Sequence, residues 1–148
     1  LCGPSHSVMD FKVVVVSEEE YEQWVQDMKD FDPEALELDA VAQEGKELFE
    51  ANSCMNCHAV GQADEYVPNQ VPLGPDLTSF GSRSRFAGIL FPTKENLLDW
   101  LLDPEEIKPD NKMTGMYPEL TEDEAGKIAE YLMQLQPTDV TPESVGAQ

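Results

Sequence analysis

Apolar residues recur every three or four positions in three separate stretches of the chain, which is the spacing of one face of an α-helix. The first stretch begins near Glu34, and its apolar positions are Leu38, Val41, Ala42, Gly45, Leu48 and Phe49. A glycine inside a helix costs about 1 kcal/mol relative to alanine. We therefore expect Gly45 to lie where a second helix crosses closely.

The second predicted helix begins after Thr93, a residue type that favours the N-cap position. The helix ends near Asp103, because the residue before a proline avoids helical geometry. Its apolar residues are Leu97, Leu98, Trp100 and Leu101.

The third predicted helix has the clearest boundaries. Thr121 and Glu124 have the spacing of a capping box, in which each side chain accepts a hydrogen bond from the other residue's backbone N–H group. Pro137 ends the helix. The face that we expect to be buried consists of Ala125, Ile128, Leu132 and Leu135, with Tyr131 beside it.

The N-terminal part of the chain has a different pattern. The β-branched run from Val13 to Val16 is typical of a buried strand. Residues 17–34 are acidic, with Tyr21 and Trp24 as small apolar anchors, and they end at Asp32-Pro33. This stretch is predicted to be a connector, with a short helix as the alternative.

The stretch between Ala59 and Pro92 is rich in glycine, proline, serine and asparagine. A loop of this length without secondary structure is uncommon in a compact domain. It is acceptable if the loop wraps around a large ligand. We therefore expect this stretch to enclose one.

Length and charge narrow the classes of function. The chain has 148 residues, of which 41% are apolar, and this is enough for one ordinary domain with tails. The formal net charge is −21, so binding to nucleic acid is excluded and an anionic membrane surface is disfavoured. The charge predicts a solvated acidic surface, and the alternative is steering of a positively charged partner.

No apolar run approaches the length of about 20 residues that a membrane span needs. The chain also begins without an initiator methionine and without the profile of a signal peptide. We therefore expect a fragment of a longer protein, whose export or anchoring segments lie upstream.

The segment Cys54-Met55-Asn56-Cys57-His58 is the attachment signature of a c-type haem. The two thiols add across the vinyl groups of the porphyrin, and the adjacent histidine lies under the iron as its ligand. A zinc site needs four ligands, and the other Cys and His residues lie far away near the N-terminus. A thioredoxin-like redox pair would need a βαβ context, which the neighbouring sequence does not have.

The sixth ligand of the iron decides between an electron carrier and a haem enzyme. A methionine opposite the histidine occupies the sixth coordination position of the iron and raises its reduction potential. An open position would instead allow reactions with peroxide or binding of gases. The candidates are Met113 and Met116, which follow Pro109 in a non-helical segment. Three other methionines, Met28, Met55 and Met133, are interpreted as core residues.

Residues from about 35 to 136 resemble the class I cytochrome c family. The residues that carry the resemblance are Gly45, Phe49 and Tyr131, together with the segment Gly74-Pro75-Asp76-Leu77. The resemblance implies an all-α fold of three main helices around one covalent haem. By the same resemblance, the glycine and aromatic residues lie where the first and last helices cross.

The resemblance also implies roles for individual residues. The carbonyl of Pro75 would accept a hydrogen bond from Nδ1 of His58, Arg83 would lie near a haem propionate, and Trp100 would pack against the haem. The spacing from Trp100 to Met113 matches the family, which makes Met113 the sixth ligand. One departure is Asp110, where the family usually has a glycine.

The first nine residues resemble the end of the binuclear copper site, CuA, in subunit II of cytochrome c oxidase. Cys2, His6 and Met9 match the second cysteine, the second histidine and the methionine of that site. The first cysteine, a glutamate and an upstream histidine are missing. The resemblance therefore implies copper binding in an intact parent protein only, and here an idle tail.

Together these features predict four regions. Residues 1–16 would be the truncated end of a cupredoxin-like copper domain that retains one β-strand, and residues 17–34 an acidic linker. Residues 35–137 would form the cytochrome c domain, followed by a tail over 138–148.

The resemblance implies the c-type haem domain of a bacterial oxidase subunit II. It would accept electrons from a cytochrome, a high-potential iron–sulfur protein or a quinol-oxidising complex. It would pass them to CuA, and from there they would reach subunit I. The domain would lie on the periplasmic side of the plasma membrane, tethered by upstream helices, and would need no catalytic acid, base or nucleophile.

Two alternatives stay open at the level of sequence. The first is a haem enzyme or ligand sensor with a labile methionine ligand, such as a peroxidase. The second is an independent soluble cytochrome c whose N-terminal residues only mimic the copper motif.

Overall fold

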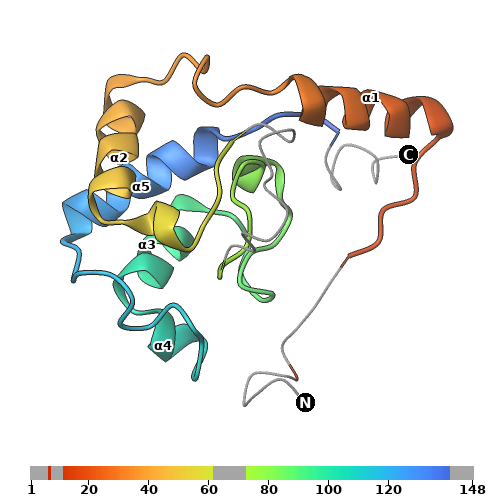
Figure 1. The fold of residues 1–148 in the computed structure, drawn as a ribbon. Helices are drawn as coiled ribbons and strands as arrows, with labels where there is room; N and C mark the ends of the chain where they lie inside the picture. The colour runs from red at the N-terminus through yellow and green to blue at the C-terminus, as the bar shows by residue number, and fades with distance from the viewer. Residues whose placement is uncertain (1–6, 8–11, 62–72, 141–148) are drawn as a thin grey trace.

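The computed structural model of the chain describes residues 7, 12–61 and 73–140 (Figure 1). Within these ranges the secondary structure is helical, and the only β feature is an isolated bridge between Phe86 and Leu90. The all-α class is confirmed. The α-helices are α1 (Glu18–Asp30), α2 (Ala40–Ala51), α3 (Lys94–Leu102), α4 (Pro104–Ile107) and α5 (Glu122–Gln134), and 3₁₀ turns cover Cys54–Asn56 and Phe80–Ser82.

The crossing of α2 and α5 forms the centre of the fold (Figure 1). A Cβ atom built on Gly45 would overlap the carbonyl group of Lys127, so the two backbones touch at this point. Phe49 and Tyr131 pack beside the crossing, with their ring centroids 5.8 Å apart. The prediction that Gly45 marks a close helix crossing is confirmed.

Helix α3 covers another side of α5 and completes the core. The buried residues of α3 are Leu97 and Leu101. Those of α5 include Ala125, Ile128 and Leu132. The whole apolar face predicted for the third helix, including Leu135 and Tyr131, is therefore buried as expected. The core also includes Ala42, Leu77, Phe80, Phe86, Ala129 and Leu135.

Side-chain caps set the starts of the helices. Thr121 and Glu124 form the predicted capping box, and Thr93 caps α3 as predicted. Helix α2 begins later than the apolar pattern indicates, because Asp39 accepts hydrogen bonds from the N–H groups of Val41 and Ala42 and fixes the start there. Val41 lies off the buried face and is 46% exposed.

The acidic stretch after Val16 forms α1, a helix of 13 residues. Ser17 and Glu20 form a second capping box at its start. Tyr21 and Trp24 stack on its surface with centroids 6.1 Å apart, and both side chains are exposed. The helical alternative for this stretch is therefore the observed one.

Thr138, which follows α5, connects α1 to the rest of the domain. Thr138 is buried, and its hydroxyl donates to a carboxylate oxygen of Asp27 on α1 over 2.8 Å. The carbonyl of Thr138 accepts from the hydroxyl of Ser82 at 3.2 Å. Through these two bonds α1 is attached to the loop that follows Gly74.

The strand predicted over Val13–Val16 is wrong for this structure. Residues 12–17 form no strand, and Val13 and Val15 are 74% and 88% exposed. A strand needs neighbouring strands to satisfy its backbone hydrogen bonds, and no strand is present among the described residues.

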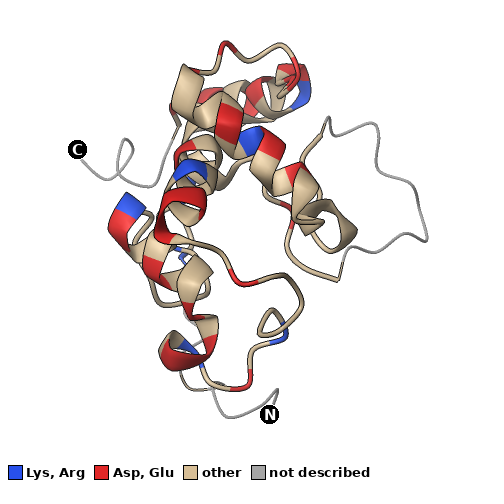
Figure 2. Cartoon of the chain, turned by 90° about the vertical axis from the view of Figure 1, so that its left-hand side faces the viewer, with Lys and Arg blue, Asp and Glu red and all other residues tan. Residues whose placement is uncertain are grey.

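Acidic side chains are spread over all the long helices, as Figure 2 shows, whereas basic side chains are few. Some of the basic residues form ion pairs on the surface, for example Lys127 with Glu44 and Asp123. Among the residues that the structure describes, every helix is too short or too polar to cross a membrane.

The crossing at Gly45 generates a first prediction. Gly45→Ala should lower the free energy of unfolding by about 1 to 3 kcal/mol, because the added methyl group overlaps the backbone of α5. The matched control is Gly126→Ala on α5, where a Cβ atom meets nothing within 4 Å. The control should raise stability by about 0.5 to 1 kcal/mol. Urea denaturation measures both, and a stabilised Gly45→Ala protein would contradict the close crossing.

The cap of α5 generates a second prediction, on pH. Hydrogen bonds from the backbone and the hydroxyl of Thr121 lower the pKa of Glu124 below its ordinary value of 4.5. The stabilisation is therefore complete above that value and is lost as the pH falls through the lower pKa of the folded chain. The urea midpoint of the wild type should fall between about pH 6 and about pH 3 more steeply than that of Glu124→Gln. Glu122→Gln, in the same turn, should follow the wild type.

Candidate functional site

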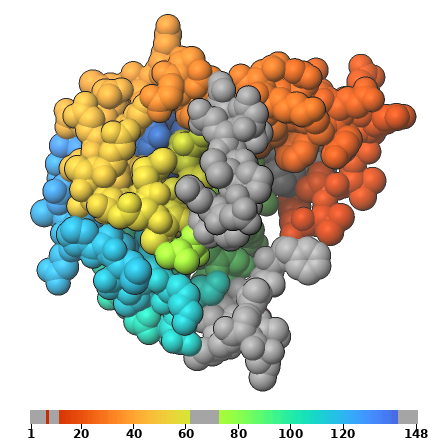
Figure 3. Space-filling model, viewed as in Figure 1, coloured from red at the N-terminus to blue at the C-terminus, as the bar shows by residue number. Residues whose placement is uncertain are grey.

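A cavity of about 720 Å³ lies between the helices and the loop over residues 73–90. This volume falls within the range of about 300 to 1,000 Å³ that is typical of ligand and cofactor sites. Figure 3 shows the face on which the segment after α2, the residues just after 72 and the 104–120 stretch meet. The apolar part of the cavity wall includes Phe49, Leu77, Phe80, Leu97, Ile128 and Leu132.

The Cys-x-x-Cys-His segment lies at one edge of this cavity on a 3₁₀ turn. Ser53 precedes the turn with a φ of 62°, which redirects the chain after α2. The carbonyl of Cys54 accepts from the N–H groups of Cys57 at 3.1 Å and His58 at 3.0 Å. Both thiols and the imidazole consequently line the same cavity.

The state of Cys54 argues against a redox-active thiol pair. Burial raises the pKa of the Cys54 thiol above its ordinary value. Reactive pairs of the thioredoxin type instead have a lowered pKa at a helix N-terminus. The half-buried Cys54 thiol therefore lacks the lowered pKa that is typical of such redox pairs.

A hydrogen bond fixes the imidazole of His58. Its Nδ1 lies 2.8 Å from the carbonyl oxygen of Pro75, which can only accept. Nδ1 therefore carries the proton, and Nε2 carries the lone pair that can bind a metal. This is the contact that the family resemblance implied for Pro75.

Two backbone hydrogen bonds between residues 57–59 and residues 74–77 place Pro75 opposite the imidazole of His58. The N–H of Gly74 donates to the carbonyl of Cys57 at 2.8 Å, and the N–H of Leu77 donates to that of Ala59 at 2.8 Å. A Cβ atom on Gly74 would lie 2.5 Å from Cε1 of His58. The imidazole therefore uses the space that a side chain at position 74 would fill.

Arg83 lies on the wall of the cavity. Its guanidinium donates to the carbonyl of Asp76, and burial lowers the pKa of Arg83 below its ordinary value. The charged form thus carries a desolvation cost, which a bound anionic group would offset. This position is compatible with the predicted contact to a carboxylate of the cofactor.

Aromatic residues form the wall near α3. Trp100 lines the cavity and meets the edge of Phe86 at a centroid distance of 6.3 Å. Phe86 in turn packs on Phe80 at 5.5 Å. These rings give the cavity a rigid apolar wall that suits a flat aromatic ligand.

Both candidate methionines line the cavity, but they differ in burial. Met113 is half-buried and packs against the core, whereas Met116 is 61% exposed. Asp110, at the position where the family usually has glycine, has a φ of 61°. Aspartate is one of the residue types that tolerate this left-handed conformation, so the chain turns there as a glycine would allow.

Two lining residues lacked a signal in the sequence. The hydroxyl of Tyr117 donates to the carbonyl of Leu101 at 2.8 Å, and burial raises the pKa of Tyr117 to about 12. The ammonium group of Lys108 donates to the carbonyl of Ala87 at 2.7 Å. Both contacts join segments that are distant in the sequence, so no local pattern could have predicted them.

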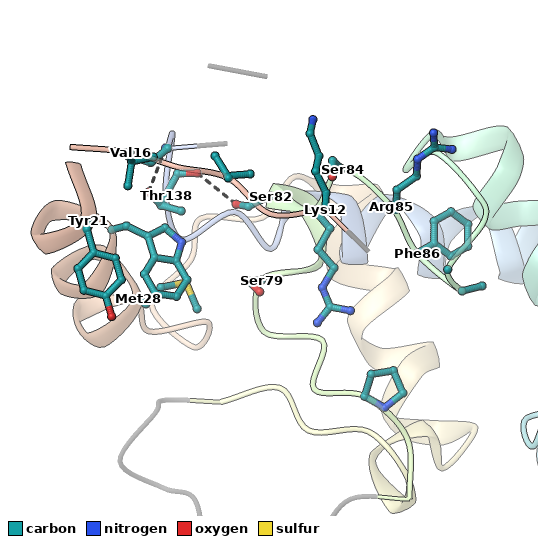
Figure 4. Close-up of a pocket in the computed structure, with 17 residues that line it drawn as sticks. Lys12, Val16, Tyr21, Met28, Ser79, Ser82, Ser84, Arg85, Phe86 and Thr138 are labelled. Atoms are coloured by element: carbon teal, nitrogen blue, oxygen red, sulfur yellow. Dashed lines mark hydrogen bonds between the residues drawn. The ribbon is translucent and has the colours of Figure 1, made fainter. Parts of the chain in front are cut away.

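A second, more open cavity of about 960 Å³ lies beside the first (Figure 4). It lies between α1 with residues 12–16 and the loop over residues 79–88, and Lys12 and Arg85 are among its lining residues. Pro75, Arg83 and Phe86 line both cavities. The copper residues proposed from the sequence, Cys2, His6 and Met9, lie outside the described residues.

The first cavity fits the haem that the sequence predicts. Two thiols stand at one edge, an imidazole presents Nε2, and a thioether lies on another segment of the wall. The rest of the lining is mainly apolar, as burial of a porphyrin requires. Each site residue predicted for the haem therefore lies at this cavity, namely Cys54, Cys57, His58, Pro75, Arg83, Trp100 and Met113.

Comparison with known proteins gives a consistent result. The chain is similar to cytochrome c oxidase subunit 2 of Bacillus subtilis (strain 168) and of Bacillus sp. (strain PS3), at 44% identity in both cases. It is 39% identical to cytochrome c oxidase subunit 2 of Alkalihalophilus pseudofirmus (strain ATCC BAA-2126 / JCM 17055 / OF4). Each alignment covers 91% of this chain and 37% of the relative, so the chain spans little more than a third of these proteins.

The family assignment rests on a separate match. Residues 42–136 match the family described as "Cytochrome c", and this range contains most of α2, the Cys-x-x-Cys-His turn, the cavity loop, α3, α4 and α5. The match covers more than half of the chain. It agrees with the helical fold and with the cavity at which the predicted haem residues meet. The chain belongs to the cytochrome c family.

Proposed function

We propose that this chain is a single-electron carrier that holds one covalent haem c in the first cavity. The observation that carries the proposal is that Cys54, Cys57, His58 and Met113 all line this cavity. They supply two attachment points and two axial ligands of different chemistry. The haem, when bound, supplies a one-electron iron couple, and the protein controls its environment.

The side chains around the iron have distinct roles in this proposal. Cys54 and Cys57 form thioether bonds, and His58 ligates through Nε2. The carbonyl of Pro75 holds the imidazole in one orientation and increases its basicity. The sulfur of Met113 closes the sixth position, which favours electron transfer over reactions at the iron.

The rest of the wall contributes to burial and charge. Arg83 compensates a propionate, since its own charge is half-buried next to the cavity. Trp100 and Phe86 line the cavity and would help to exclude water from a bound haem. A dry site with a fixed positive charge stabilises the reduced iron and keeps the potential high.

The names of the relatives support a place for this chain in an oxidase. Proteins named cytochrome c oxidase subunit 2 match almost the whole chain, so we propose that it is the haem domain of such a subunit. In the complete protein it would take electrons from a cytochrome, an iron–sulfur protein or a quinol-oxidising complex. It would pass them to CuA, for which Cys2, His6 and Met9 would supply ligands, and then to subunit I.

The location and the domain limits belong to the same proposal. The cytochrome c domain would occupy residues 35–137, next to the acidic residues 17–34 and the remnant of the copper domain over 1–16. In the complete protein this domain would lie on the extracytoplasmic side of the plasma membrane, held there by helices upstream of the present chain.

Spectroscopy of the purified chain tests the proposal directly. Reduced and oxidised spectra should show a c-type haem that stays attached after denaturation, because thioether bonds are covalent. The ferric form should show the weak far-red band of sulfur ligation, and the ferrous form should bind carbon monoxide poorly. A colourless chain, or ready binding of carbon monoxide, would refute the electron-carrier function.

Substitution of the methionines generates a further prediction. Met113→Ala should abolish the far-red band, allow carbon monoxide to bind and lower the midpoint potential, because the sulfur ligand is lost. Met116→Ala is the matched control and should change none of these, since Met116 is exposed. If Met116→Ala opens the iron and Met113→Ala does not, the assignment of the sixth ligand is wrong.

A further inference from the structure

The segment that carries Met113 has no regular secondary structure of its own. Residues 108–116 follow α4 and form only turns and bends. A loop of this kind would hold a ligand atom poorly unless other contacts fix it, because each ordered residue costs about 1 to 2 kcal/mol of backbone entropy. Two polar side chains, Asn111 and Glu105, make hydrogen bonds that fix the part of this segment around Met113.

The side chain of Asn111 bonds the loop on both sides. Its Oδ1 accepts from the backbone N–H groups of Met113 at 2.9 Å and Thr114 at 3.0 Å. Its Nδ2 carries two hydrogens and lies within hydrogen-bond distance of three acceptors, the carbonyls of Pro104 and Lys108, both at 2.9 Å, and the hydroxyl of Thr114 at 2.8 Å. One side chain thus joins the Met113 backbone to Pro104, the first residue of α4, and to Lys108, its C-cap.

Glu105 on α4 makes a second connection to the same loop. One carboxylate oxygen accepts from the N–H of Asp110 at 3.0 Å, and the other accepts from the hydroxyl of Thr114 at 3.0 Å. Hydrogen bonds to an ionised carboxylate are stronger than those between neutral groups. The bond to Asp110 also holds the residue that has a positive φ.

Helix α4 itself has a firm base. Asp103 caps it through the N–H of Glu106 at 3.0 Å, Pro104 is buried, and α4 packs against α3. The hydrogen bonds of Asn111 and Glu105 therefore attach the loop to a fixed part of the domain. The Met113 backbone has its position set relative to the wall that includes Leu101 and Trp100.

We propose that Asn111 and Glu105 are positioning residues that hold Met113 against the iron and keep its sixth position closed. This inference rests on the proposed function, in which Met113 is the sixth ligand. Neither residue touches the iron in this scheme. Both act through the backbone that carries Met113, so their loss should loosen the sulfur bond without removing it.

The test uses the haem-loaded chain with Asn111→Ala and Glu105→Gln, and Glu106→Gln as the control. Glu106 lies next to Glu105 on the same short helix and is exposed, so the control makes the same change of charge. Imidazole is the probe, because it competes with the methionine sulfur for ferric iron. Each hydrogen bond lost should raise the imidazole affinity by up to about tenfold, and the far-red band should weaken.

A double substitution separates positioning from general stability. In the background of Met113→Ala, Asn111→Ala should have no further effect on imidazole affinity, because the sulfur that it positions is already absent. The inference would be overturned if the imidazole affinity were unchanged in both Asn111→Ala and Glu105→Gln. It would also be overturned if Asn111→Ala raised that affinity equally in the wild type and in Met113→Ala. Should Asn111→Ala fail to fold, Glu105→Gln keeps the outline of the side chain and carries the test.

The two proposals fail in different ways. If the wild-type chain already binds imidazole as readily as Met113→Ala, the methionine is not the sixth ligand and the proposed function fails. If the wild type binds imidazole weakly and the variants of Asn111 and Glu105 bind it equally weakly, only the positioning role fails.

Discussion

The close approach of α2 and α5 at Gly45 is the contact on which the rest of the structure depends. With no side chain at Gly45 between them, the two helices touch, and the end of α2 lines the same cavity as α3 and α5. The chain then turns at Ser53 and presents Cys54 and His58 to the space that these helices leave. A wider crossing would separate the attachment turn from the apolar wall of α5.

Backbone hydrogen bonds, rather than helices, form the opposite side of the cavity. The segment after His58 pairs with the segment from Gly74 onward, and Thr78 binds the backbone of Gly61 through its hydroxyl. These bonds hold a stretch that has little secondary structure. The cavity thus has one wall fixed by helix packing and another fixed by polar contacts, which suits a cofactor that is apolar in its plane and charged at its edge.

Local patterns in the sequence predicted the elements that depend on local physics. The apolar spacing gave α2, α3 and α5, and Thr121 with Glu124 gave the start of α5. Ser17 and Glu20 have the same spacing as that pair, so the sequence held a signal for α1 as well. The composition of the valine run favours a strand, but a strand also needs a neighbouring strand, which composition does not reveal.

The candidate site divides in a similar way. Cys54, Cys57 and His58 lie in one short motif, so their proximity follows from the sequence alone. The contact between His58 and Pro75 joins residues far apart in the chain and was expected only from family resemblance. The bonds of Asn111 had no signal in advance, because asparagine in a loop is common and its partners depend on how the chain turns.

The bond between Thr138 and Asp27 gives residues 17–34 a mechanical character that their composition does not suggest. A flexible tether of this length would let whatever precedes it sample a wide volume. Helix α1, which is hydrogen-bonded to Thr138, instead limits the upstream chain to one side of the domain. The hydroxyl group of Thr138 would then help to set the direction from which the upstream part of the protein reaches this domain.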